Sequence, residues 1–260
     1  MKPVKKITRS GEFPDSIKSS KISLPSDTFH KDFLKELYEA GIKNDADIVV
    51  AGSLMFQNEN PEIRGTRCPP DFFVDNVSKI GYILQSVYGC FRPMWGKLFK
   101  VSVINKQRVY REKRPIKIFN GADTLFCLDM LRLSNSVVGI NKALYYYRMR
   151  KDSLYKKSID KTRYSNYKVI YDESKKLLLK WDKFNAVTSR FISMVLYYSL
   201  KDCMDIAANA TNLSIKEKIE VIEAILSDEM INEVIRKNGL LNNLFSDIQI
   251  SLNTIVKKCS

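Results

Sequence analysis

Histidine is nearly absent from the sequence, which contains His30 and no other. The five cysteines, at positions 68, 90, 127, 203 and 259, lie far apart, and no two have CxxC spacing. This pattern argues against a metal site built from clustered cysteine and histidine. No signal peptide follows Met1-Lys2-Pro3, so we interpret the cysteines as reduced thiols of a cytoplasmic protein.

Long hydrophobic runs are also missing. No apolar stretch approaches the ~20 residues that span a bilayer, so we expect any membrane contact to be peripheral. The chain has no zinc spacing, RNP-like aromatic motif or dominant basic helix, and we do not expect nucleic acid as its partner.

Basic residues are in excess: 43 Lys and Arg against 29 Asp and Glu give a net charge of +14 and a pI near 9.4. Such a charge attracts anions, including an acidic membrane surface or phosphorylated ligands. A solvated basic surface without a dedicated ligand is the alternative. The densest basic stretch, residues 97–117, is interrupted by aromatic and apolar residues.

Hydrophobic periodicity predicts a mixed α/β segment in the first part of the chain. Helices are expected at residues 29–43, 71–87, 102–106 and 123–133, the first capped by Asp27 or Thr28. Short strands are expected at 48–52, 137–140 and 144–147, and residues 53–70 are expected to form a polar connection.

Beyond about residue 160, helical patterns follow one another with little glycine or proline. Ser214 and Glu217 match a capping box, and Gly239 is a natural stop for a helix at 228–237. We therefore predict a basic lead-in at 1–22, a mixed domain at 23–158 and a helical extension at 159–260.

Three segments, in this order, resemble the second half of family 2 glycosyltransferases. The first begins with Leu-Pro-Ser-Asp-Thr-Phe at 24–29 and continues through a helix to Ala-Asp-Ile-Val-Val-Ala-Gly at 46–52, similar to the family's ADIVVCG. The second is Trp-Gly-Lys-Leu-Phe at 95–99, close to WNKLF. The third is Gly-Ala-Asp-Thr-Leu-Phe at 121–126, followed by Gly-Ile-Asn at 139–141 and Leu-Tyr-Tyr-Tyr-Arg at 144–148.

The resemblance implies an α/β fold: an incomplete GT-A-like mixed sheet with flanking helices, followed by an all-helical C-terminal region. It implies transfer of a sugar from a nucleotide-sugar donor to a glycan or lipid-linked acceptor in surface polysaccharide synthesis. A protein in that role would act in the cytoplasm or peripherally at the inner face of the plasma membrane, where lipids are anionic.

The family binds a divalent cation, Mg²⁺ or Mn²⁺, through a D-x-D segment that stabilises the leaving diphosphate. Here the matching positions are Pro25, Ser26 and Asp27, so Asp27 is the remaining candidate metal ligand. A helix N-cap is an equally weighted interpretation of this residue.

The family's catalytic base comes from an acidic pair that precedes a helix. Asp123 matches the second member of this pair, and Ala122 replaces the first. Asp123 is therefore the candidate base, and a simple first-turn carboxylate favoured by the helix dipole is the alternative.

Trp95 and Lys97 would line the acceptor side, the ring stacking on a sugar and the ammonium meeting an anionic group. Core packing for Trp95 and a solvated side chain for Lys97 are the alternatives. Arg148 could hold phosphate through its guanidinium fork, unless it is a surface arginine of an edge strand. Because side chains alternate along a strand, at least one of Tyr145, Tyr146 and Tyr147 is expected in the core.

The nucleotide-binding half of the family is not matched. It begins with βαβ units of about 30 residues each, and only 22 residues precede the similar segments. We therefore expect a truncated or degenerate member that, alone, binds nucleotide-sugar weakly or not at all. A non-catalytic protein that binds a glycan or a partner is the alternative. The sequence predicts no oligomeric state.

Overall fold

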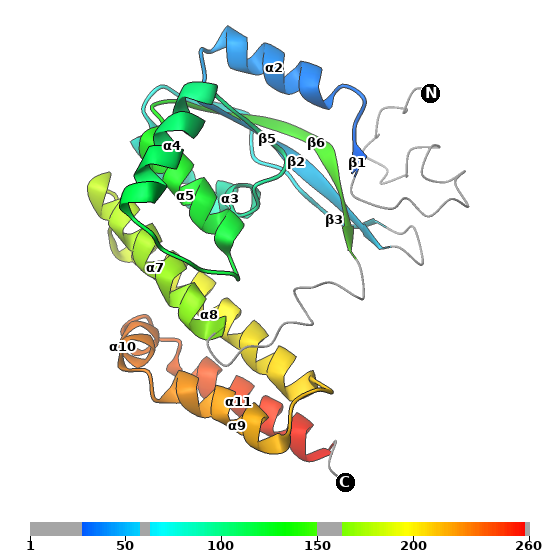
Figure 1. Cartoon of the computed structure of the whole chain (residues 1–260), viewed down its shortest axis with the longest axis vertical. Coiled ribbons are helices and arrows are strands. Elements are labelled where there is room, and N and C mark those ends of the chain that lie inside the picture. Colours follow the sequence, from blue (N-terminus) through cyan, green and yellow to red (C-terminus); the bar gives the residue numbers. More distant parts are fainter. Residues whose placement is uncertain (1–27, 58–62, 150–162, 258–260) are drawn as a thin grey trace. The chain divides into compact units, whose positions relative to one another are not determined.

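A computed structural model describes residues 28–57, 63–149 and 163–257 (Figure 1). The chain forms two compact units. The first contains residues 1–116 and 126–151 and holds the sheet. The second contains residues 117–125 and 152–260 and is built from helices. The predicted boundary between residues 158 and 159 lies outside the described residues.

The sheet of the first unit has two long central strands, β2 (Ile48–Gln57) and β6 (Val137–Met149), which run parallel. Short antiparallel strands flank them. β1 (Thr28–Phe29) and β4 (Phe72–Val74) pair with β6, whereas β3 (Ile63–Arg67) and β5 (Lys97–Phe99) pair with β2. The result is a six-stranded mixed sheet.

Helix α2 (Phe33–Lys43) covers one face of this sheet (Figure 1). Its Phe33 and Leu37 pack against apolar side chains of the two central strands, which are Val49, Ala51, Val138, Ile140 and Leu144. Helices α3 (Ile80–Phe91) and α4 (Val101–Lys113) lie on the other face. Burial of these branched and aromatic side chains is the main force that holds the layers together.

The first two predicted helices begin later than expected. Residues 28–29 form strand β1, and α2 begins at Phe33 after Asp32, so neither Asp27 nor Thr28 caps it. Residues 72–74 form β4 rather than a helix, because they pair with residues 137–139 of β6; in this strand Val74 is buried and Phe73 is exposed. The predicted helix at 71–87 is therefore wrong in its first turns; a short 3₁₀ segment (Val77–Lys79) leads into α3.

The expected polar connection at 53–70 is also wrong. Strand β2 continues to Gln57, five residues beyond Gly52, and forms a hairpin with β3. Gly52 permits this pairing: a Cβ built there would lie 2.3 Å from Cys68 Sγ and 2.8 Å from Cys68 Cα. The polar residues of this segment misled the prediction because β3 is an edge strand with exposed side chains.

The two strands predicted at 137–140 and 144–147 are one continuous strand, β6. Its pairing with β2 shifts register on both sides of Gly52, which pairs with Ala143. The short helix expected at 102–106 is the longer α4. Helix α5 (Ala122–Leu133) confirms the prediction at 123–133.

The second unit contains helices α7 (Arg163–Lys180), α8 (Ala186–Asn209), α9 (Ile215–Leu226), α10 (Glu229–Lys237) and α11 (Leu241–Lys257). The predicted capping box is confirmed: Ser214 Oγ accepts from Glu217 N, and Glu217 Oε2 accepts from Ser214 N. Gly239 follows α10 with φ +69°, the left-handed conformation expected of a helix stop.

The fold class is thus the predicted one, a mixed α/β sheet with flanking helices followed by a helical C-terminal region. Across the described ranges, no helix is both long and apolar enough to cross a membrane. The four described cysteines, at positions 68, 90, 127 and 203, are free thiols.

Candidate functional site

Three aromatic side chains of the first unit form a stack. The Trp95 indole lies 4.5 Å from the Tyr145 ring at an interplanar angle of 7°, and 5.3 Å from the Tyr147 ring at 17°. Tyr145 is buried, whereas Trp95 and Tyr147 are half-buried. Parallel stacking fixes the indole, and its exposed part and that of Tyr147 form an aromatic surface. We call these three residues the aromatic stack.

Phe29 extends the aromatic stack toward the edge of the sheet. Its ring meets Tyr145 edge-on at 5.3 Å and is 55% exposed. Strand β1 positions it, since Phe29 pairs with Tyr145 across the sheet. An exposed ring that continues a stack of aromatic side chains is suited to bind the apolar face of a sugar.

Lys97 holds the turn that carries Trp95. Its Nζ donates to the carbonyl oxygens of Cys90 and Pro93, both at 2.5 Å, and of Trp95 at 3.3 Å. Only 7% of Lys97 is exposed. The interpretation of Lys97 as a solvated side chain is therefore wrong. Its predicted contact with an anionic acceptor group gains no support, because the ammonium faces carbonyl oxygens.

The turn is fixed from a second side by Gly96. This residue has φ +74°, which favours glycine, and its carbonyl oxygen accepts from Ala51 N at 2.9 Å. Trp95 is therefore held by a strand hydrogen bond and by a buried ammonium. Its position does not depend on a ligand.

Arg148 lies on the opposite face of β6 from the aromatic stack. Side chains alternate along a strand, so Tyr145 and Tyr147 share one face and Tyr146 and Arg148 the other. Arg148 is 7% exposed and pairs with Phe56 of β2. The interpretation of Arg148 as a surface arginine of an edge strand is therefore wrong, because β6 is central and the side chain is buried. The structure does not bring Arg148 to Trp95, and a phosphate-binding role gains no support from its burial.

Asp123 belongs to the second unit and lies in the first turn of α5. Its side chain is exposed, and Oδ1 accepts from Thr124 N at 2.9 Å. Gly121, with φ +84°, makes the turn that precedes the helix. This geometry fits both interpretations from the sequence: an oriented, accessible carboxylate, and a local stabiliser of the helix start.

The candidate metal ligand Asp27 lies outside the described residues. Among those that are described, no group of three histidine, cysteine, aspartate or glutamate side chains could hold a metal ion. The Mg²⁺ or Mn²⁺ requirement remains a prediction that depends on Asp27.

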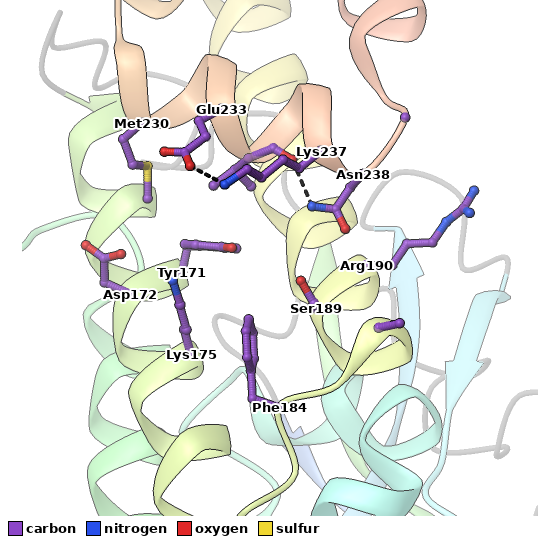
Figure 2. Close-up of a pocket in the computed structure, with 13 residues that line it drawn as sticks. Tyr171, Asp172, Lys175, Phe184, Ser189, Arg190, Met230, Glu233, Lys237 and Asn238 are labelled. Carbon is purple, nitrogen blue, oxygen red and sulfur yellow. Dashed lines mark hydrogen bonds and ion pairs between the residues drawn. The ribbon is translucent and has the colours of Figure 1, made fainter.

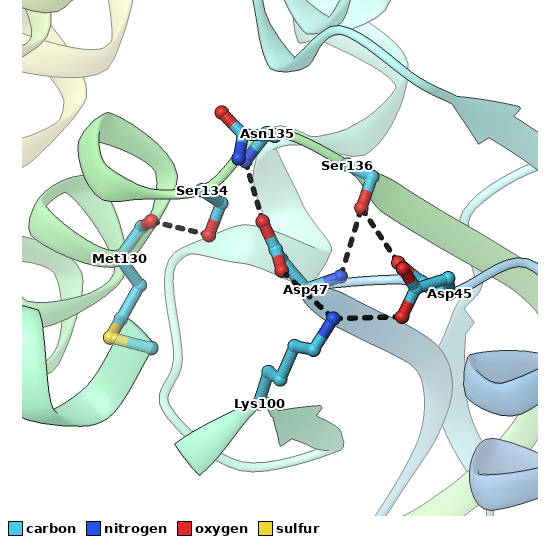
Figure 3. A network of polar contacts seen from close by, with 7 residues as sticks. All are labelled: Asp45, Asp47, Lys100, Met130, Ser134, Asn135 and Ser136. Carbon is cyan, nitrogen blue, oxygen red and sulfur yellow. Dashed lines mark hydrogen bonds and ion pairs between the residues drawn. The ribbon is translucent and has the colours of Figure 1, made fainter. Parts of the chain in front are cut away.

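A polar network joins the starts of the two central strands (Figure 3). Asp47 Oδ2 accepts from Asn135 N at 2.7 Å, and Asp47 N donates to Ser136 Oγ at 3.0 Å. Lys100 Nζ donates to Asp45 Oδ1 at 2.8 Å and lies 3.8 Å from Asp47 Oδ1. In open α/β sheets, ligands bind at the carboxyl ends of the parallel strands. This network lies at the amino ends of β2 and β6. We therefore assign it a structural role.

Several cations of the densest basic stretch, residues 97–117, contact polar groups within the protein. Besides Lys97 and Lys100, Arg111 and Arg114 lie 3.7 and 3.5 Å from the carboxylate of Asp129. Burial raises the pKa of this carboxyl, and the two arginines oppose that rise. The stretch is therefore less available to an external anion than its sequence indicates.

The three tyrosines at 145–147 made part of the aromatic stack predictable from the sequence. The prediction that at least one of the three is in the core is confirmed, since both Tyr145 and Tyr146 are buried. The stacking of Trp95 on two of them was missed. The available signal was the spacing of Tyr145 and Tyr147, which places both rings on one face.

No protein-family model matches the chain, and no curated protein matches its sequence. The fold is similar to a crystal structure of S. aureus TarS 1–349 in complex with UDP-GlcNAc. The TM-score is 0.46 at 13% identity, with 88% of this chain and 64% of that one covered. A second structure of the same TarS segment gives a TM-score of 0.49 at 12% identity, with 93% and 67% covered. The chain spans about two thirds of the length of these TarS structures.

Proposed function

We propose that this chain is a glycosyltransferase-like protein. It transfers a sugar from a nucleotide-sugar to a glycan or lipid-linked acceptor in surface polysaccharide synthesis, with activity impaired when the nucleotide-binding half is missing. The observation that carries the proposal is the fixed aromatic stack at the segment that resembles the acceptor side of family 2 glycosyltransferases.

The aromatic stack supports acceptor binding. Sugar rings present apolar C–H faces, and the exposed parts of Trp95, Tyr147 and Phe29 offer flat apolar surface to meet them. Because Lys97 and Gly96 fix the Trp95 turn in advance, little conformational freedom is lost when an acceptor binds. Lys97 thus acts on the acceptor through Trp95, as a positioning residue.

Asp123 is the proposed base. The acceptor hydroxyl attacks the anomeric carbon, the bond to the nucleotide diphosphate breaks, and the carboxylate takes the hydroxyl proton. The hydrogen bond from Thr124 N orients this carboxylate, and its exposure leaves it accessible.

A non-catalytic glycan- or partner-binding protein is the second candidate. The specific observation in its favour is that Pro25 and Ala122 stand where the family has carboxylates. In this case the aromatic stack still binds the glycan, but no transfer follows.

Two measurements on the full chain separate the candidates. UDP-GlcNAc, present in one of the TarS structures, is the donor to test first, with Mn²⁺ and a glycan acceptor. Transfer that Asp123→Asn abolishes while acceptor binding persists supports a transferase. Acceptor binding without transfer supports the second candidate. If Trp95→Ala and Tyr147→Ala leave acceptor binding unchanged, both candidates are wrong about the aromatic stack.

Micromolar, metal-dependent binding of a nucleotide-sugar that Asp27→Ala abolishes would contradict a different expectation. It would show that this chain retains a donor site despite the unmatched half.

A further inference from the structure

The helical unit contains a pocket of about 710 Å³ around Phe184, which projects into it from the turn between α7 and α8 (Figure 2). The charges that face its interior compensate one another. Lys237 forms an ion pair with Glu233, and Lys175 interacts electrostatically with both Glu233 and Asp172. The pocket therefore presents no excess of charge to a ligand, and no step of the proposed transfer uses it.

Helix α2 of the first unit has apolar side chains on two sides. Phe33 and Leu37 are buried against the sheet. Leu34, Tyr38 and Ile42 follow one another at four-residue intervals on the side away from the sheet, and they are 65%, 64% and 66% exposed (Figure 1). Single exposed apolar residues are normal in soluble proteins, but these three form a continuous row along one helix. We call Leu34, Tyr38 and Ile42 the α2 ridge.

The residues of this face are arranged symmetrically about Tyr38. Leu34 and Ile42 lie four residues before it and four residues after it. Lys31 and Asp45 lie seven residues before it and seven residues after it, just outside the two ends of the helix. Apolar residues therefore correspond to apolar residues on the two sides of Tyr38, and a cation corresponds to an anion.

Such a face is complementary to its own copy in the reversed direction. Two-fold symmetry would place two α2 helices antiparallel, with Tyr38 of each copy meeting at the axis. Leu34 of one copy would then face Ile42 of the other, and Lys31 would face Asp45. Rows of side chains with four-residue spacing are also the ridges that interlock in the commonest class of helix pairs.

Lys31 and Asp45 are accessible to a second copy, since their side chains are 50% and 90% exposed. Asp45 Oδ1 accepts from Lys100 Nζ at 2.8 Å, and Lys31 Nζ lies 3.9 Å from Asp32 Oδ2. A carboxylate has about four acceptor positions and an ammonium has three donors. Neither contact therefore excludes an additional partner.

We propose that the outer face of α2 is the interface of a two-fold symmetric homodimer, and that its occupant is a second copy of this chain. The α2 ridge forms the apolar centre, and two reciprocal Lys31–Asp45 pairs close its ends. The interface is independent of the proposed transfer function. Leu144 packs against α2, whereas its neighbour Tyr145 belongs to the aromatic stack on the opposite face of the sheet.

The interface is small. An 11-residue helix is ~16 Å long, and one of its faces covers less than the ~800 Å² per partner of a standard interface. Each copy also carries a net charge of +14, which opposes association. We therefore expect a weak dimer, with a Kd of about 10–100 µM at about 0.15 M salt, where charges more than ~8 Å apart are largely screened.

Sedimentation equilibrium of the full chain, with a reductant present, tests the proposal. Between about 1 and 300 µM protein, we expect the mass to rise from that of the 30.0 kDa monomer toward twice that value. Tyr38→Glu brings two carboxylates together at the axis and should weaken association at least about tenfold. The matched control is Tyr82→Glu, since Tyr82 is a 75% exposed tyrosine of α3 and should not affect the dimer.

Circular dichroism and thermal unfolding confirm that both variants fold, which we expect because both tyrosines are exposed. A wild-type chain that is monomeric at about 300 µM would overturn the proposal. A dimer that the folded Tyr38→Glu protein retains would overturn it as well, because association would then use another surface.

Two further variants test the antiparallel orientation. Lys31→Glu sets like charges against each other at both ends and should weaken the dimer several fold. Tyr38→Cys places two thiols at the axis, within reach of an intermolecular disulfide when oxidised glutathione is added. Tyr82→Cys is its control, both in a Cys259→Ser background. The proposed arrangement is wrong if the two cysteine variants crosslink at the same rate, or if Lys31→Glu leaves the affinity unchanged.

Discussion

The indole of Trp95 lies parallel to the ring of Tyr145, with 4.5 Å between their centroids and 7° between their planes. Trp95→Ala removes this contact and the one to Tyr147. We expect the free energy of unfolding to fall by about 2 kcal/mol, less than the ~3–5 kcal/mol for a fully buried aromatic side chain, because Trp95 is half-buried. Urea denaturation measures the change.

Trp95→Phe is the matched variant, since it keeps a ring in the stack. It should recover most of the lost stability and part of the acceptor binding. A Trp95→Ala protein as stable as the wild type would show that the stack contributes nothing to folding.

Lys97→Met keeps the length of the side chain but removes three donated hydrogen bonds. The carbonyl oxygens of Cys90, Pro93 and Trp95 then lose a buried partner, which should cost about 1–3 kcal/mol of stability. In a Trp181→Phe background, the fluorescence of Trp95 reports the release of its turn and should shift to longer wavelength.

Lys79→Met is the control for this change. Lys79 is an exposed lysine that pairs with Asp75, four residues earlier, and surface pairs of this kind contribute little. The assigned role of Lys97 is wrong if both substitutions have the same small effect on stability and on fluorescence.

Asp47→Ala should destabilise the first unit by about 1–3 kcal/mol, because Asn135 N and Lys100 lose a buried carboxylate. Asp45→Asn is the comparison, because Asp45 has φ +44°, a conformation that asparagine adopts more readily than alanine. Asp45 binds the same lysine, but its side chain is 90% exposed, so its loss should have a much smaller effect. Equal effects in chemical denaturation would contradict the central place of Asp47 in the network.

The Cys90 thiol gives the stability of the protein a dependence on alkaline pH. Burial raises the pKa of Cys90 from its ordinary value near 9 to about 11. Between these values the unfolded chain has lost the proton and the folded chain retains it. Stability therefore falls as the pH rises through this window.

Cys90→Ala removes this contribution. Denaturation at pH 8 and pH 10.5 should show a smaller loss of stability in the variant than in the wild type. Other groups titrate in both proteins, so the difference between the two pH dependences is the quantity that decides. If they coincide, Cys90 has no part in the effect.

Much of the fold was predictable because local patterns agree with tertiary structure. The helix at 122–133, the capping box of Ser214 and the stop at Gly239 depend on neighbouring residues, and all three are confirmed. The first turns of the predicted helix at 71–87 failed because pairing with β6 decides the conformation of residues 72–74. Pairing between strands that lie far apart in the chain produces no periodic pattern in the local sequence.

The candidate site was less predictable. The resemblance selected Trp95 and Lys97, but the contacts of both residues depend on tertiary packing. The turn that carries Trp95 connects α3 to β5, and Trp95 stacks on side chains of β6. Lys97 could not be recognised as buried, since a lysine between apolar residues in the sequence is usually solvated. The pocket around Phe184 draws on residues from 171 to 239 and has no motif.

Strand β6 pairs with β1, β2 and β4, all of which precede it by at least 60 residues in the chain. On the ribosome, these three strands are therefore synthesised well before the strand that joins them. Until about residue 149 has emerged, the edges of β2 that β6 will cover stay unpaired and open to other chains. Because of this order of synthesis, the nascent first unit exposes a strand edge to which chaperones can bind. Slow translation of the segment before β6 would prolong this exposure and lower the yield of folded protein.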